Sequence, residues 1–193
     1  MIRTPEQYVQ GLRDGRVVYQ DGKRINDVVA AWPRNVERAA SEFYVANLPK
    51  NRALFTMMED GEEVSFSFKI PETPEDLQRR RDILKALGEL GAGGSRLTGI
   101  DGLNGVAFGT TKIDAAMGTH YTENMAKYRA WCKKNDPSIC AAVSDPKGNR
   151  ALHGEDPRQA HKDFYFRIVD RKKDGIGIYG CKDRKRTRLN NSH

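Results

Sequence analysis

The sequence predicts a mainly α protein with β hairpins, in which a helical N-terminal domain leads into the first strands of a truncated β domain. Capped, amphipathic helical segments fill the first part of the chain, and alternating β-prone runs follow from about residue 139. We therefore expect a helical domain over 1–138, the start of a β domain over 139–182, and a separate tail over 183–193.

The first expected elements are a helix and a hairpin. Thr4 before Pro5 is a helix start, with Gly15 as its end. Asp-Gly at 21–22 lies between short β-prone runs at 16–19 and 23–28, which predicts a hairpin.

Helices dominate the following stretch, with one strand among them. Trp32-Pro33 interrupts the chain before a helix over 35–46. Residues 63–70 alternate apolar and polar side chains and predict a half-buried strand or an extended arm. Thr73-Pro74 followed by two acidic residues predicts the next helix start. Two further helices are expected over 102–117 and 122–135.

The last part of the chain predicts strands. The apolar run 139–143 is expected to be a strand that opens into a tight turn. Runs at 163–170 and 176–181, joined across Lys172-Lys173-Asp174-Gly175, predict a second hairpin.

The turn at Ser144-Asp145-Pro146-Lys147-Gly148-Asn149-Arg150 suits an anionic ligand. Lys147 and Arg150 bring two cations, and Gly148 permits a positive φ and close backbone approach. A phosphate-bearing or flavin cofactor would fit, and a plain surface turn is the alternative interpretation.

Charge does not demand a nucleic-acid partner. The formal net charge is +7, of which the last eleven residues carry +3, which leaves +4 for the rest. That tail resembles the translation of a sequencing-library adapter, so we expect the biological sequence to end near Lys182; a disordered basic tail is the alternative.

Other classes of site are disfavoured. Cys132, Cys140 and Cys181 have neither disulfide-framework nor metal-ligand spacing, so we expect reduced thiols and no metal. No apolar run approaches the ~18–20 residues of a membrane span, and no secretory signal is visible at the N-terminus. We expect no membrane association and a cytoplasmic location.

A family resemblance extends over nearly all of residues 1–182. It is carried by an ordered set of short motifs: Thr4-Pro5-Glu6-Gln7-Tyr8, Glu75-Asp76-Leu77, Gly99-Ile100-Asp101 with Asn104, Phe108, Thr110-Thr111, Tyr121, Asn135-Asp136, Ser144 to Arg150, Asp163 to Val169, Lys173-Asp174-Gly175-Ile176 and Gly180-Cys181-Lys182. This set resembles the flavoprotein family of 4-hydroxyphenylacetate 3-monooxygenase and 4-hydroxybutyryl-CoA dehydratase.

The resemblance implies an acyl-CoA dehydrogenase-like fold, of which this chain holds the N-terminal helical domain and the start of the β domain. It implies an FAD-dependent oxidoreductase that hydroxylates an aromatic ring or dehydrates an acyl-CoA, with a phenol or acyl-CoA substrate, a flavin reductase as partner and a homotetramer for the full-length protein. The implied FAD contacts are Ser144, Asp145, Pro146, Lys147, Gly148, Asn149, Arg150 and Ala151.

This chain departs from the family pattern at five positions, four of which lie near Asp101 in the sequence. The two iron–sulfur cysteines of the dehydratase branch correspond to Gly93 and Leu97, so that part of a cluster site is absent. The substrate-gripping Arg and Tyr of the hydroxylase branch correspond to Thr98 and Gly102, and its His near the flavin corresponds to Ala141. Thr98 and Gly102 remain the substrate-binding candidates, and no catalytic residue is assigned.

Three further features have two interpretations each. His120 is either a base or a helix-start residue, and Arg79-Arg80-Arg81 is either a phosphate patch or a solvated helix face. Arg96 either holds a substrate carboxylate or makes a loop contact. The alternative function is a small basic cytoplasmic binding domain without catalysis. The fragment alone is expected to be inactive.

Overall fold

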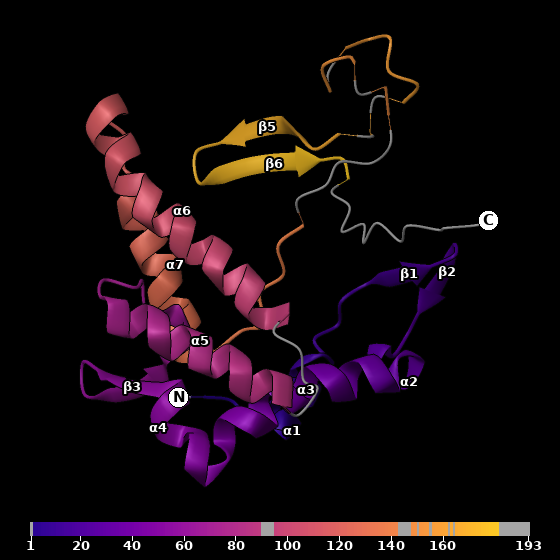
Figure 1. Ribbon diagram of the computed structural model, residues 1–193. Coiled ribbons are helices and arrows are strands. Elements are labelled where there is room, and N and C mark those ends of the chain that lie inside the picture. Colours follow the sequence, from indigo (N-terminus) through magenta and orange to yellow (C-terminus); the bar gives the residue numbers. More distant parts are fainter. Residues whose placement is uncertain are drawn as a thin grey trace, which may run out of the picture. The chain divides into compact units, whose positions relative to one another are not determined.

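The computed structural model describes residues 2–89, 95–142, 148–149, 151–154, 156–161, 163 and 165–181. They separate into two compact units between Cys140 and Ala141, and each is described by itself. The first unit is built mainly from helices and the second contains a two-stranded hairpin, which confirms the predicted class of a mainly α chain with β hairpins (Figure 1). The tail over 183–193 lies outside the described residues.

The first unit contains thirteen elements in its described residues. In chain order they are α1 (Pro5–Gly11), β1 (Val18–Gln20), β2 (Lys23–Ile25), α2 (Val28–Ala31), α3 (Pro33–Asn47), the 3₁₀ turn η1 (Pro49–Asn51), α4 (Arg52–Phe55), β3 (Thr56–Glu59), β4 (Glu62–Ser65), the 3₁₀ turn η2 (Phe66–Phe68), α5 (Pro74–Glu89), α6 (Ser95–Met117) and α7 (Tyr121–Asn135).

Reciprocal side-chain caps start two of these helices where the sequence predicts them. At α1, Thr4 Oγ1 accepts from the Gln7 amide at 3.2 Å, and Gln7 Oε1 accepts from the Thr4 amide at 2.9 Å. At α5, Thr73 Oγ1 accepts from the Asp76 amide at 3.2 Å, while Asp76 accepts from the Thr73 amide at 3.3 Å. These pairs satisfy amides that have no partner within the helix.

Two antiparallel hairpins turn on Asp-Gly pairs with positive φ. The β1–β2 hairpin turns at Asp21 and Gly22, with φ of 50° and 75°, and confirms the sequence prediction. The β3–β4 hairpin turns at Asp60 and Gly61, with φ of 51° and 77°, and was not predicted.

The strand expected over 63–70 ends at Ser65 and is replaced by η2. Every side chain from Val64 to Phe68 is buried, including Ser65 and Ser67, so the alternation does not reflect one wet and one dry face. The apolar and small polar side chains are buried together where this segment passes through the interior.

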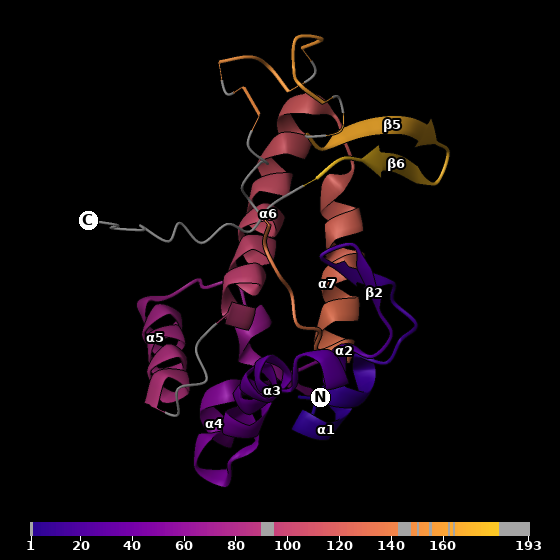
Figure 2. The same cartoon turned by 90° about the vertical axis from the view of Figure 1, so that its right-hand side faces the viewer.

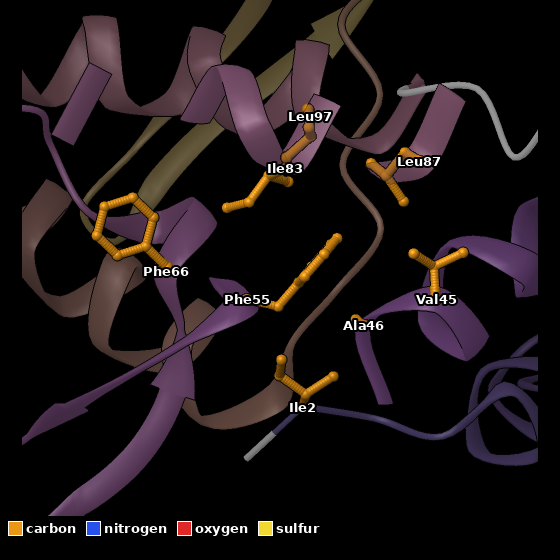
Figure 3. Close-up of a cluster of buried hydrophobic side chains, with 8 residues drawn as sticks. All are labelled: Ile2, Val45, Ala46, Phe55, Phe66, Ile83, Leu87 and Leu97. Atoms are coloured by element: carbon orange, nitrogen blue, oxygen red, sulfur yellow. The ribbon is translucent and has the colours of Figure 1, made fainter. Parts of the chain in front are cut away.

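The largest core cluster gathers α3, α4, α5, η2 and the start of α6 around Phe55. In Figure 3 its side chains converge on one interior volume, and its members are Ile2, Val45, Ala46, Phe55, Phe66, Ile83, Leu87 and Leu97. A second cluster joins η2, α6 and α7 through Phe68, Ile100, Leu103 and Cys132. Tyr8 stacks on Phe43 at 4.9 Å between ring centroids and ties α1 to α3.

The long helices α6 and α7 lie side by side (Figures 1 and 2). α6 begins at Ser95, earlier than the Gly102 start that the sequence predicts. Its glycine Gly99 faces the extended chain after α7, where a methyl group would overlap the Ile139 carbonyl. The described residues 139–142 form no strand, so the strand expected over 139–143 is wrong there.

Asp114 at the end of α6 holds the start of α7. Its carboxylate accepts from Thr119 Oγ1 at 2.6 Å and from the amides of Tyr121 and Thr122 at 2.9 and 2.8 Å. These hydrogen bonds, above all the one from Thr119, hold the pKa of Asp114 well below its usual range.

The lowered pKa of Asp114 predicts a pH-dependent contribution to stability. A carboxyl whose folded pKa is depressed stabilises above its unfolded pKa of about 4, and the benefit is lost as the pH falls through the folded value. The loss of unfolding free energy caused by Asp114→Asn should therefore be larger at pH 7 than at pH 3, measured by urea unfolding followed by circular dichroism. Glu37→Gln, at an exposed α3 position, is the control. Equal losses at both pH values would contradict this role.

The second unit carries the antiparallel hairpin of β5 (Arg167–Lys172) and β6 (Gly175–Tyr179), which confirms the predicted one. Its strands are largely exposed on both faces, and six large apolar or aromatic side chains are accessible: Phe166, Ile168, Val169, Ile176, Ile178 and Tyr179. Among the described residues of both units, no helix has the length and apolarity to cross a bilayer.

Candidate binding loop and the exposed face of helix α6

The proposed cofactor loop is described only in part. Ser144, Asp145, Pro146, Lys147 and Arg150 lie outside the described residues, whereas Gly148, Asn149 and Ala151 lie within them. The described part is shaped by a buried glutamine, Gln159, that the sequence analysis did not single out.

Gln159 fastens the loop with its side-chain amide. Its Oε1 accepts from the Asn149 amide at 3.1 Å, and its Nε2 donates to the Asn149 carbonyl at 2.9 Å. Asn149 Oδ1 in turn accepts from the Ala151 amide at 3.1 Å, a local turn typical of asparagine. The backbone polar groups of Asn149 and the Ala151 amide are therefore hydrogen-bonded from within the loop.

Gly148 is required for packing. A Cβ at this position would come within 2.8 Å of Gln159 Oε1 and 2.9 Å of the Tyr165 hydroxyl. The absence of a side chain at Gly148 allows Gln159 and Tyr165 to approach the loop backbone.

The substrate-binding candidates Thr98 and Gly102 both lie exposed on α6, one helical turn apart. Between them Asp101 forms an ion pair with Arg80 of α5; the Asp101 side chain is 54% exposed and that of Arg80 13%. Apart from Gly102's sequence neighbours and nearby helix backbone, no described atom would come within 4 Å of a Cβ at this position, so the helix surface is open there. The structure thus brings Thr98, Asp101 and Gly102 to one accessible surface.

This face of α6 is held in place by three side chains that bind the backbone of η2 and the residue after it. Arg80 donates to the Ser67 carbonyl at 3.0 Å, and Asn104 Nδ2 donates to the carbonyls of Ser67 and Lys69 at 3.1 and 3.2 Å. Arg129 of α7 donates to Asn104 Oδ1 and to the Phe68 carbonyl. Burial lowers the pKa of both arginines.

Arg96 is not available to a substrate carboxylate. Its guanidinium is buried and paired with Asp136, and its Nε lies 3.4 Å from the Pro137 carbonyl. Arg96 also lies over the rings of Phe43 and Phe68. The segment after α7 is its binding partner, which leaves the loop-contact interpretation as the correct one.

The arginine triplet of α5 does not form one phosphate patch. Arg79 donates to carbonyls of α4 and β3, Arg80 pairs with Asp101, and Arg81 points to solvent. His120 is exposed immediately before α7.

The structure describes two of the three remaining positions at which this chain departs from the family pattern. Leu97, at a cluster-cysteine position, is part of the main core, and Gly93 lies outside the described residues. Ala141 is described and partly buried. Within the described ranges, no group of three His, Cys, Asp or Glu side chains is arranged to hold a metal ion.

Residues 4–187 match the family described as 4-hydroxyphenylacetate 3-hydroxylase N terminal. The chain is 29% identical over 188 residues to 4-hydroxybutyryl-CoA dehydratase/vinylacetyl-CoA-Δ-isomerase of Clostridium aminobutyricum, covering 94% of this chain and 38% of that protein. The chain therefore spans well under half the length of this relative.

Solved structures show the same fold. An oxygen-tolerant archaeal 4-hydroxybutyryl-CoA dehydratase from N. maritimus matches with a TM-score of 0.81 at 26% identity, over 94% of this chain and 37% of that one. The oxygenase component of 4-hydroxyphenylacetate 3-monooxygenase, in complex with FAD and 4-hydroxyphenylacetate, matches with a TM-score of 0.77 at 23% identity, over 93% and 38%. These matches confirm the acyl-CoA dehydrogenase-like N-terminal fold.

Proposed function

The chain belongs to the 4-hydroxyphenylacetate 3-hydroxylase N-terminal family, and from this premise we propose that it is the N-terminal part of an FAD-dependent oxidoreductase. The match over residues 4–187 carries the proposal, because it includes the helical domain, the 144–151 loop and the β5–β6 hairpin together. Residues 1–138 would form the helical domain and 139–182 would begin the β domain.

The residues of the loop fit an anionic dinucleotide. Ser144, Lys147 and Arg150 offer a hydroxyl, an ammonium and a guanidinium, the donors that phosphate oxygens accept. Gln159 binds both backbone polar groups of Asn149, which would limit the entropy lost when the loop binds. We propose Ser144 to Ala151 as FAD contacts; the bound flavin would supply the redox chemistry.

The substrate would lie against the face of Thr98, Asp101 and Gly102. Thr98 offers one hydroxyl and Gly102 no side-chain donor, so this face lacks the Arg and Tyr side chains that bind the substrate in the hydroxylase pattern. Leu97 lies in the core at a position where the dehydratase branch has a cysteine ligand of its iron–sulfur cluster, so this ligand is missing here. Both a phenol and an acyl-CoA remain within the proposed substrate class.

The full-length protein is proposed to be a cytoplasmic homotetramer. If it hydroxylates a phenol, it would draw reduced flavin from a reductase partner. The 193-residue chain by itself is proposed to be inactive, since its relatives are more than twice its length.

Flavin uptake by a longer protein tests the proposal. A longer open reading frame recovered from the source DNA should yield a yellow protein, or one that takes up added FAD with saturable quenching of flavin fluorescence. Lys147→Gln with Arg150→Gln in that protein should weaken FAD binding by about a hundredfold or more, because charge-assisted hydrogen bonds are worth about 1.5–3 kcal/mol each. Lys172→Gln, at the exposed end of β5, is the matched control.

A long protein that stays colourless with added FAD would overturn the proposal and favour a binding domain without catalysis. Equal FAD affinity in the doubly substituted protein and the control would remove the loop from the cofactor site while leaving the family assignment intact.

A further inference from the structure

A solvent-open cavity of about 460 Å³ lies on the first unit, and neither Thr98 nor Gly102 lines it. Its walls come from β3, the segment after η2, the first two turns of α5, and α7. This volume falls in the range of small-molecule sites in proteins.

The charged side chains around the cavity do not balance. Four cationic and three acidic side chains line it, which leaves one net positive charge. Lys69 pairs with Asp76 at 2.9 Å and Lys133 pairs with Glu59. The third acid, Glu72, is exposed at the rim.

The two remaining cations, Arg79 and Arg129, have no acidic partner. Arg79 donates to the backbone carbonyls of Ala53, Leu54 and Thr56. Arg129 donates to the side-chain amide oxygen of Asn104 and to the Phe68 carbonyl. Within the described part of the chain, no carboxylate lies within ion-pair distance of either guanidinium. Neutral acceptors orient these groups without cancelling their charge.

The burial of Arg79 and Arg129 also favours the binding of an anion beside them. Burial is the largest effect on both arginines and lowers their pKa, although Asp76 near Arg79 and Glu59 near Arg129 act in the opposite direction. A desolvated cation gains more from an incoming anion than one in water does.

The rest of the lining is apolar. Met57, Met58, Phe66 and Ile70 supply it, and the Arg79 guanidinium lies 3.9 Å from the Phe66 ring centroid. Methionine side chains adapt to ligands of different shape. The cavity therefore offers an apolar wall beside two guanidiniums.

We propose that this cavity binds a small organic monoanion, with its carboxylate toward Arg79 and Arg129 and its apolar body against Met57, Phe66 and Ile70. The single net positive charge of the lining matches one carboxylate, and a carboxylate accepts charge-assisted hydrogen bonds from guanidinium N–H groups. This site depends on the first unit alone and does not rest on the flavin function.

Methyl NMR of the 193-residue chain, labelled with [¹³C-methyl]methionine, tests the site. Hexanoate should shift the methyl signals of Met57 and Met58 in a saturable way. Met117, exposed at the end of α6, should not move. Hexanamide, which has nearly the same shape but no charge, should bind at least about fivefold more weakly, since it forgoes about 1 kcal/mol or more of charge–charge attraction.

Two opposite substitutions sharpen the test. Lys69→Gln should weaken hexanoate binding about fivefold, because it removes a cation and leaves Asp76 uncompensated. Glu72→Gln should tighten it about two- to threefold, and unfolding cannot produce a gain. Glu75→Gln, an exposed α5 residue outside the cavity lining, should change nothing.

Three results would overturn the proposal: no saturable shift at Met57 and Met58, equal affinity for hexanoate and hexanamide, or unchanged affinity in both Lys69→Gln and Glu72→Gln. Loss of the shifts in Ile70→Trp, which fills the cavity without altering its charge, would support the assigned position of the ligand.

Discussion

Replacing Gly99 by alanine is expected to destabilise the helical unit by about 3 kcal/mol, near the upper end of the usual cost of overpacking. The new methyl group would overlap the Ile139 carbonyl and reach the Cys140 nitrogen at 3.0 Å. Both obstacles are backbone, so neither can rotate away, and the chain after α7 would have to lift from α6. Urea unfolding monitored by circular dichroism would measure the loss.

Gly105→Ala is the matched control on the same helix. Gly105 is exposed, and no other atom would come within 4 Å of its Cβ. Alanine in a helix interior is favoured over glycine by about 1 kcal/mol, so this variant should be more stable than wild type. If the two variants shift stability in the same direction, the close approach of Ile139 to α6 would be refuted.

Asp136→Asn is expected to cost about 3–5 kcal/mol, because it leaves a buried guanidinium without its counter-charge. The Asp136 side chain is 0% exposed and that of Arg96 is 7% exposed. Asp136 also accepts from the Arg3 amide at 3.0 Å, and its carbonyl accepts from Arg3 Nε at 2.8 Å. The pair thus joins the N-terminal segment, the start of α6 and the end of α7.

Asparagine is the appropriate replacement at residue 136, where φ is 45°, because it tolerates the left-handed conformation and isolates the loss of charge. Adding Arg96→Met should recover part of the loss, since the unpaired cation is then removed. Asp14→Asn, which breaks an exposed ion pair with Arg16, should leave the unfolding midpoint nearly unchanged. A double variant less stable than Asp136→Asn alone would argue against this account.

Local signals in the sequence predict local structure well in this chain. The caps at Thr4 and Thr73 depend on residues three positions away, and the Asp21-Gly22 turn needs only its own φ values. The family assignment likewise depends on short motifs in order, each of which is visible without a structure.

Long-range contacts account for what could not be predicted. Four glycines from 99 to 109 lower the helix propensity, so the start of α6 predicted from the sequence is too late. One of them, Gly99, is nevertheless necessary, because the Ile139 backbone packs against it. Arg96 looks like a ligand-binding residue until the chain brings Asp136 beside it. The uncompensated arginines of the cavity depend on contacts with backbone far along the chain, which no spacing rule encodes.

The β5–β6 hairpin has a practical consequence for handling this protein. Its strands show apolar side chains on both faces, and two strands alone are marginally stable in water. Each outer strand edge can pair with the hairpin of another molecule, as in intermolecular β-sheet assembly. The cluster Arg171-Lys172-Lys173 beside the turn opposes such stacking by charge repulsion, so added salt should promote precipitation of the chain.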